Sequence, residues 1–197
     1  YDKLILSPGA RPVGSNLPGE DDPRVFTLRT VEDTLRIHEF VKTHHPRSVV
    51  LAGGGFISLE MAENLRELGM EVTMVQRPKQ LMNPFDPEMA SFIHAKMRKK
   101  GVRLLLGHTV EGFEEAPGGV RVLLKGAEPL EAELVVLAIG VTPDTQLAKE
   151  AGLELGVKGS IAVNDRMETS VPDIYAVGDA VQVQHFVTGE HTLISLA

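Results

Sequence analysis

Residues 48–60 read Ser-Val-Val-Leu-Ala-Gly-Gly-Gly-Phe-Ile-Ser-Leu-Glu, and this stretch decides the fold. The apolar run Val49–Ala52 is of the kind that a buried parallel strand needs. Three glycines interrupt it, and apolar residues then recur with a helical period up to Gly69, where a glycine that ends a helix is expected. Residues 71–75 have the pattern of a second strand. The segment therefore predicts a strand–turn–helix–strand unit.

Within such a unit, the glycines match the G-x-G-x-x-G pattern of a dinucleotide-binding turn. Gly53 permits the tight turn, Gly54 follows it, and Gly55 lets a pyrophosphate approach the backbone. The next helix presents unpaired N–H groups and the positive end of its dipole to the anion. Ser58 replaces the third glycine, at a position where a small side chain is tolerable. The alternative is an ordinary glycine-rich turn without a ligand.

The composition excludes several classes of function. The 197 residues carry a formal net charge of -7, which argues against a nucleic-acid partner. No stretch is long and apolar enough to span a membrane, and no signal peptide precedes Tyr1, so we expect a cytoplasmic protein without a membrane partner. The chain has no cysteine and hence no thiol chemistry of its own. His38, His44, His45 and His94 have no partner at ligand spacing, so we read them as structural or solvated, and we predict no metal site.

Strand and helix signals alternate along the rest of the chain and predict an α/β fold. Thr30 and Asp33 have the spacing of a capping box, and Asp86 with Pro87 opens a helix that ends before Gly101. We expect a parallel central sheet with helices on both faces, and a small antiparallel meander from residues 110–124. Residues 7–23 read as a loop. Further strands are expected over residues 1–6, 102–106, 133–139, 161–163 and 174–177, and a short helix over 143–151.

Four segments together resemble one family, in its order and at plausible separations. They are residues 1–12, the glycine loop 53–60, Ala-Ile-Gly-Val-Thr-Pro at 138–143, and Thr-Ser-Val-Pro-Asp-Ile-Tyr-Ala-Val-Gly-Asp at 169–179. They are similar to those of the flavin-dependent pyridine nucleotide–disulfide oxidoreductases, and especially to the NADH oxidase and coenzyme A-disulfide reductase branch. The resemblance covers essentially the whole chain.

The resemblance implies a Rossmann-like NAD(P)-binding domain over residues 24–142, flanked by remnants of an FAD-binding domain at 1–23 and 143–197. The family's FAD pyrophosphate loop, redox cysteine and dimerisation domain have no match here. We therefore expect a piece of a longer flavoprotein that is a homodimer and that acts on a small-molecule substrate. The remainder of that flavoprotein is the expected partner of these residues.

The family's functional residues carry over to matching positions. The backbone of Phe56 and Ile57 joins the glycines at the NAD(P) pyrophosphate. Phe56 stands where the family often has a tyrosine over the nicotinamide pocket, and Glu60 matches a glutamate near the nicotinamide. Gly140 matches a glycine beside the nucleotide, and Asp179 an aspartate that hydrogen-bonds the flavin ribityl chain. Taken alone, Phe56 is also compatible with core packing, Glu60 with an exposed first-turn carboxylate, and Asp179 with a turn or cap.

The end of the second strand departs from the usual NAD pattern. An acidic residue is expected there to accept from the ribose 2′-OH of NAD, and an arginine suits the 2′-phosphate of NADP. The chain has Gln76 followed by Arg77. We therefore hypothesise that NADPH is accepted at least as well as NADH, because Arg77 is able to pair with a phosphate.

The implied reaction is hydride transfer from NAD(P)H to FAD, with the electrons passing on to a disulfide, a peroxide or oxygen. No catalytic residue is expected within this chain; Phe56 and Glu60 are supporting residues. Isolated, the chain is expected to bind nucleotide without turnover and to retain no flavin. The alternatives are a reductase of the ferredoxin or nitrite type, and a non-catalytic dinucleotide-binding module.

Overall fold

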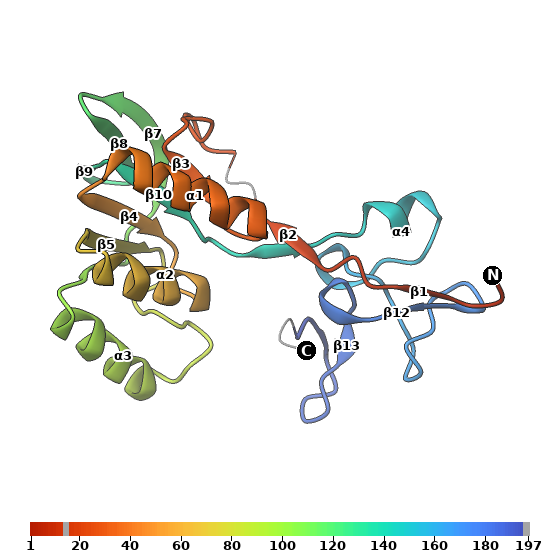
Figure 1. Ribbon diagram of the computed structural model, residues 1–197. Coiled ribbons are helices and arrows are strands. Elements are labelled where there is room, and N and C mark those ends of the chain that lie inside the picture. The colour runs from red at the N-terminus through yellow and green to blue at the C-terminus, as the bar shows by residue number, and fades with distance from the viewer. Residues whose placement is uncertain (14–15, 195–197) are drawn as a thin grey trace. The chain divides into compact units, whose positions relative to one another are not determined.

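The computed structural model describes residues 1–13 and 16–194. The chain forms two compact units (Figure 1). The first combines Tyr1–Val13 with Val141–Ala197, and the second is Gly14–Gly140. Among the described residues, no helix has both the length and the apolar character needed to cross a bilayer.

The second unit is built on a five-stranded sheet in the order β3-β10-β4-β5-β6, with every neighbouring pair parallel. The central strand β4 pairs Val50 with Val135 on one side and with Thr73 on the other. This confirms the predicted parallel α/β sheet. The strands are β3 Val25–Thr27, β4 Ser48–Ala52, β5 Glu71–Gln76, β6 Arg103–Leu106 and β10 Leu134–Leu137.

Three helices connect these strands: α1 Val31–His44, α2 Phe56–Glu67 and α3 Pro87–Lys99. The predicted capping box of α1 is present, since Thr30 and Asp33 exchange backbone-to-side-chain hydrogen bonds. Gly69 ends α2 as predicted, with a left-handed φ of 88° and the two reverse-turn hydrogen bonds of a Schellman motif. Pro87 begins α3 as predicted, but the side chain of Asp86 makes no capping hydrogen bond.

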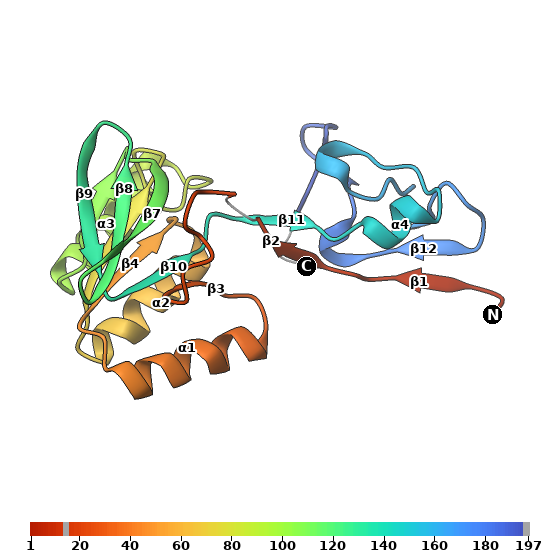
Figure 2. The ribbon, with the colours of Figure 1, turned by 90° about the horizontal axis from the view of Figure 1, so that it is seen from above.

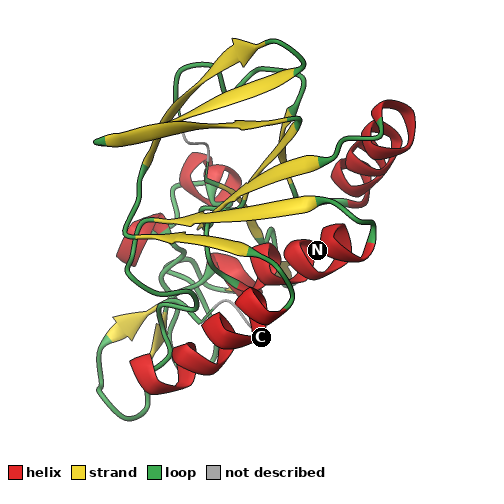
Figure 3. Cartoon of the chain, turned by 90° about the vertical axis from the view of Figure 1, so that its left-hand side faces the viewer, coloured by secondary structure: helices red, strands yellow, loops and turns green. Residues whose placement is uncertain are grey.

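The two faces of the sheet are covered differently, which corrects the expectation of helices on both. All three helices pack on one face, where Ile37, Leu65 and Met97 meet alternate residues of β4 and β5. The other face carries a three-stranded antiparallel meander, whose Val120 and Val122 meet the intervening strand residues (Figures 2 and 3). The meander is β7 Val110–Ala116, β8 Gly119–Leu124 and β9 Ala127–Ala132; β9 was not predicted.

The first unit is built from three short strand pairs around a small core that includes Ile161, Ala176 and Val181. β1 Leu4–Leu6 runs parallel to β12 Ile174–Ala176. The other pairs are antiparallel, β2 Ala10–Pro12 with β11 Val141–Pro143 and β13 Val183–Gln184 with β14 His191–Thr192. The short helices are α4 Gln146–Glu150 and the 3-10 turns η1 Val157–Gly159 and η2 Gly178–Ala180.

Two local predictions need correction, and one strand of the sheet was not predicted. The predicted loop 7–23 contains β2, because its backbone pairs with the distant β11. The predicted strand 161–163 is not formed; Ile161 makes only isolated bridges, to Leu155 and Val181. The short edge strand β3 was not predicted.

The units divide after Val13 and after Gly140, whereas the predicted boundaries were 23 and 142. The reason for the first difference is that the segment before Pro23 packs on the meander. Leu17 lies against its core cluster, and the Pro18 carbonyl accepts a hydrogen bond of 2.8 Å from the Phe113 amide. That the first unit belongs to an FAD-binding domain stays a prediction.

Candidate functional site

The glycine loop lies between the carboxyl end of β4 and the first residue of α2. Gly53 has a φ of 125°, a backbone conformation that residues with a side chain rarely adopt. A Cβ added to Gly53 would lie 2.1 Å from the carbonyl oxygen of Ala138. The Gly53 amide also donates to Val75 at 2.8 Å. The tight turn predicted at Gly53 is therefore enforced by the backbone on both sides of it.

Gly54 and Gly55 face different surroundings. A Cβ on Gly54 would lie 2.8 Å from the side chains of both Gln76 and Leu81, and the Gly54 carbonyl accepts from the Met82 amide at 2.7 Å. A Cβ on Gly55 would meet nothing within 4 Å. The protein thus holds the loop through Gly54 and leaves open space at Gly55, where the sequence predicts that a pyrophosphate approaches.

The first turn of α2 has the features of an anion site. Gly55 is the N-cap residue and supplies no side-chain cap, and the first turn carries no acidic residue. The first helical amide to bond within the helix is that of Leu59, which donates to Gly55 at 3.1 Å. The amides of Phe56, Ile57 and Ser58 precede it. Within the part of the chain that the structure describes, they have no hydrogen-bond acceptor, so they are available to a ligand or water at the positive end of the helix dipole.

Ser58 occupies the third position of the glycine pattern and is only 1% exposed. Its hydroxyl lies 3.2 Å from the place where a Cβ on Gly53 would stand. Among the described residues, this Oγ is buried without any hydrogen-bond partner. The close packing agrees with the expectation that a small side chain is tolerable here, but within the described part of the chain the hydroxyl makes no stabilising hydrogen bond.

We therefore expect Ser58→Ala to raise the free energy of unfolding by about 1 kcal/mol, since a buried unsatisfied hydroxyl costs about 1–3 kcal/mol. Ser58→Gly, which restores the third glycine, should be about 1 kcal/mol less stable than Ser58→Ala because glycine is a poor helix former. Urea unfolding followed by circular dichroism measures both. A clear loss of stability in Ser58→Ala would show that the hydroxyl has a partner in solution.

Gln76 and Arg77 lie at the carboxyl end of β5, next to the loop. Gln76 is half-buried, and its side chain lies against Gly54. Arg77 is exposed and takes part in no ion pair within the described part of the chain. The structure thus brings Gln76 to the loop and leaves the guanidinium of Arg77 available at the same end of the sheet.

Phe56 and Glu60 lie on the outer side of α2. Phe56 is 50% exposed, and its ring meets that of Phe85 edge-on with centroids 6.4 Å apart. The alternative that Phe56 belongs to the core is therefore wrong. Glu60 is exposed and, with Ile57, lines a groove of about 710 Å³ between α1 and α2.

Gly140 and Asp179 lie at the ends of two other strands. Gly140 follows β10, is exposed, and has a φ of 128° with open space at its Cβ position. Asp179 belongs to the first unit, in the turn η2 that follows β12. There Gly178 has a φ of 84° beside the hydroxyl of Ser7, the residue that follows β1. Both residues thus lie at carboxyl ends of parallel strands, where ligands of α/β sheets bind.

Comparison with known proteins identifies the family. Residues 1–193 match the family model described as pyridine nucleotide-disulphide oxidoreductase. The chain belongs to this family. A curated relative, the NADH oxidase of Methanocaldococcus jannaschii, is 38% identical over 98% of the chain and 43% of its own length. The chain thus spans less than half of that relative.

Solved structures of this oxidoreductase family agree with the fold. The reduced CoADR-RHD of Bacillus anthracis is 47% identical, with a TM-score of 0.95 over all of this chain and 35% of its own. The water-forming NADH oxidase from Lactobacillus brevis, bound to NADH, is 31% identical, with a TM-score of 0.91 over all of this chain and 43% of its own. The predicted family and branch are thereby confirmed.

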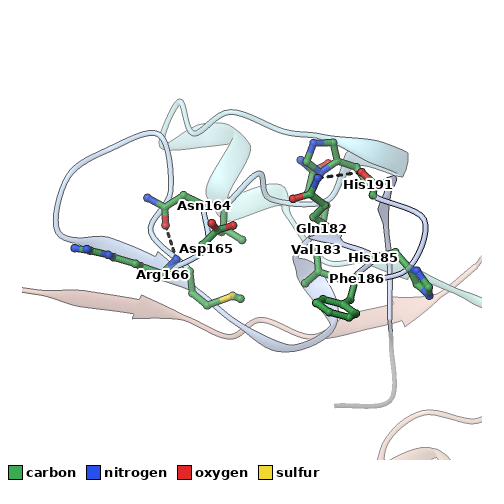
Figure 4. A pocket seen from close by; sticks show the side chains of 12 residues that line it. Asn164, Asp165, Arg166, Gln182, Val183, His185, Phe186 and His191 are labelled. Carbon is green, nitrogen blue, oxygen red and sulfur yellow. Dashed lines mark hydrogen bonds between the residues drawn. The ribbon is translucent and has the colours of Figure 1, made fainter.

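In this chain, a second cavity of about 820 Å³ lies in the first unit. Figure 4 shows its lining, which includes Asn164, Arg166 and His185. None of the residues predicted to bind a cofactor lines it. Within the described part of the chain, no cluster of three or more His, Asp or Glu side chains is placed to hold a metal ion.

The residues that contact Gly54 and support the glycine loop were not predicted as part of the site. Leu81 and Met82 are 0% and 2% exposed and contact Gly54, and His94 of α3 accepts a hydrogen bond from the Leu81 amide. The sequence predicted His94 only as structural or solvated. No local pattern indicates these contacts, because they depend on the path of the loop after β5.

Proposed function

We propose that the Gly53–Gly55 loop and the first turn of α2 bind the pyrophosphate of NAD(P)H. The observation that carries this proposal is the open space at Gly55, in front of helix amides that no acidic or capping side chain occupies. A Cβ-free approach and a free helix N-terminus are what a dinucleotide pyrophosphate requires. The Lactobacillus brevis relative, which binds NADH, supports the assignment.

The longer protein is proposed to be an FAD-dependent oxidoreductase. When bound, FAD would supply the redox chemistry of hydride transfer from NAD(P)H, with a disulfide, a peroxide or oxygen as the final acceptor. The names of two relatives, a water-forming NADH oxidase and a coenzyme A disulfide reductase, support oxygen and a disulfide among these acceptors. Because these 197 residues hold no cysteine, any redox thiol belongs to another part of that protein.

The supporting roles rest on where the side chains lie. Phe56, half exposed beside the loop, is proposed to cover the nicotinamide, and Glu60 to help hold that end of the nucleotide. Gly140 would let the nucleotide pass close to the end of β10. Asp179 would accept a hydrogen bond from the flavin ribityl chain. A homodimeric state and a cytoplasmic location of the longer protein stay predictions from the sequence.

The direct test is a titration of the 197-residue chain with NADH and NADPH, followed by calorimetry. ADP-ribose, which keeps the pyrophosphate, should compete with both, whereas adenosine, which lacks it, should not. Competition by adenosine as effective as that by ADP-ribose would place the binding energy elsewhere than at the helix N-terminus. Absence of any nucleotide binding would contradict the proposed function.

The same titration tests the choice of nucleotide. We expect NADPH to bind at least as tightly as NADH, and Arg77→Ala to weaken NADPH about tenfold, since a charge-assisted bond to phosphate contributes about 1.5–3 kcal/mol. NADH affinity should change little, because its ribose carries no phosphate for Arg77 to bind. Lys79, which is also exposed and close in sequence, provides a matched control as Lys79→Ala. A clear preference for NADH that persists in Arg77→Ala would overturn the hypothesis.

A further inference from the structure

We propose that His94 is a positioning residue for the nucleotide loop and acts through the segment Leu81–Met82. The inference rests on the proposed nucleotide function of that loop. Leu81 and Met82 contact Gly54, the residue before Gly55, and His94 contacts Leu81. The contacts that connect them lead from Gly54 back to helix α3.

The first step is the contact between the segment and Gly54. The Met82 amide donates to the Gly54 carbonyl at 2.7 Å, and the Leu81 side chain comes within 2.8 Å of the place where a Cβ of Gly54 would stand. Both residues are buried, and Met82 has a left-handed φ of 49°, which is uncommon for a residue with a side chain. The segment therefore forms a fixed support on the protein side of the loop.

The second step is the hydrogen bond to α3. The Leu81 amide donates to Nε2 of His94 at 3.0 Å. Only a neutral imidazole with its proton on Nδ1 accepts this bond, because an imidazolium has no free nitrogen lone pair. His94 thus ties the segment to a helix that begins at Pro87 and packs against the sheet.

The same segment also contacts Phe56, through Phe85. The Gln80 amide group donates to the carbonyl of Phe85 at 2.8 Å, and the Phe85 amide donates to Met82 at 2.8 Å. The Phe85 ring in turn meets the ring of Phe56. Residues 80–85 are therefore one hydrogen-bonded unit that contacts both Gly54 and the first residue of α2, and a shift of Leu81 would be felt at both.

The charges around His94 favour its neutral form. The ring is packed by its own helix and by the segment before it. Burial lowers the pKa of His94 below its ordinary value, and the positive charge of Arg98, one turn along α3, lowers it further. Arg98 is the one charged side chain in the described part of the chain that acts on this pKa. The segment presents the Leu81 N–H, whose dipole also opposes a proton on Nε2.

The test compares His94→Gln with His94→Leu in the 197-residue chain. In His94→Gln, the oxygen of the new side-chain amide is able to replace Nε2 as an acceptor, whereas leucine fills the space without one. We expect His94→Leu to weaken NADH binding about tenfold, and His94→Gln to stay within about twofold of the wild type. Hydrogen exchange should be faster at the Leu81 and Met82 amides in His94→Leu only.

The pH dependence supplies a readout that packing alone would not move. Wild-type NADH affinity should fall only as the pH drops through the lowered pKa of His94, below the ordinary histidine pKa of about 6.5, and that of His94→Gln should stay flat over the same range. Equal exchange at Leu81 and Met82 in both variants, or the same pH profile in wild type and His94→Gln, would overturn the inference. If the wild type binds neither nucleotide, the proposed function fails, and the exchange data still decide whether His94 orders the segment.

Discussion

Gly53→Ala is expected to destabilise the chain by about 2–6 kcal/mol, a large part of the about 5–15 kcal/mol that holds a domain folded. Two costs add. A side chain at a φ of 125° is strained, and its Cβ would stand 2.1 Å from the Ala138 carbonyl oxygen, so the end of β4 and the residues after β10 must separate. The Gly53 amide bond to Val75 would be strained by the same shift.

Gly69→Ala is the matched control for this prediction. Gly69 also has a positive φ, 88°, but a Cβ there meets nothing within 4 Å, so only the conformational strain of about 1–3 kcal/mol applies. Urea unfolding of both variants, followed by circular dichroism, gives the difference. If Gly53→Ala costs no more than Gly69→Ala, the close approach of Ala138 to the loop does not limit this position.

The parts of the fold that the sequence predicted well are those with local causes. The β4–α2–β5 unit follows from an apolar run, a glycine turn and a helical period within one stretch. The capping box at Thr30 and the glycines that end α2 and α3 are equally local, since each depends on residues within a turn of it. These signals do not depend on what the element packs against.

The errors in the sequence-based predictions concern tertiary packing and the pairing of distant strands. Helices were expected on both faces of the sheet, but the meander covers one face, and no local pattern in α1 or α3 reveals which face they choose. Strand β9 was not predicted because Pro129 is unfavourable in a strand and because Glu128 and Glu131 give no apolar alternation. Pro129 is tolerated there because β9 is an edge strand of the meander. Apolar residues 161–163 were read as a strand, although their pairing depends on distant residues.

The candidate site divides in the same way. Its front, Gly53 to Ser58, was predicted because the motif fixes both the order and the spacing of the residues. The residues that support Gly54 were not predicted, because Leu81 belongs to the loop after the neighbouring strand β5 and His94 lies 13 residues beyond Leu81. The glycines also proved unequal: the backbone crowds Gly53, side chains crowd Gly54, and only Gly55 borders open space.

This inequality makes Gly55 the position where binding and stability can be separated. Gly55 is the N-cap of α2 with a φ of -90° and an extended ψ, a conformation that suits a capping aspartate. Gly55→Asp should therefore stabilise the chain by about 0.5–1 kcal/mol through a cap and a favourable interaction with the helix dipole. At the same time its carboxylate would occupy the space proposed for the pyrophosphate.

We accordingly expect Gly55→Asp to lower NADH and NADPH affinity by at least about 100-fold, because like charges brought together at a binding site cost several kcal/mol. Gly55→Asn is the control: it has nearly the same size and also caps helices, but carries no charge, and should lose only about tenfold from bulk. Calorimetric titration and urea unfolding on the same samples measure both quantities. Unchanged nucleotide affinity in a stabilised Gly55→Asp chain would show that no pyrophosphate binds at this helix N-terminus, whereas opposite signs of the two effects would place it there.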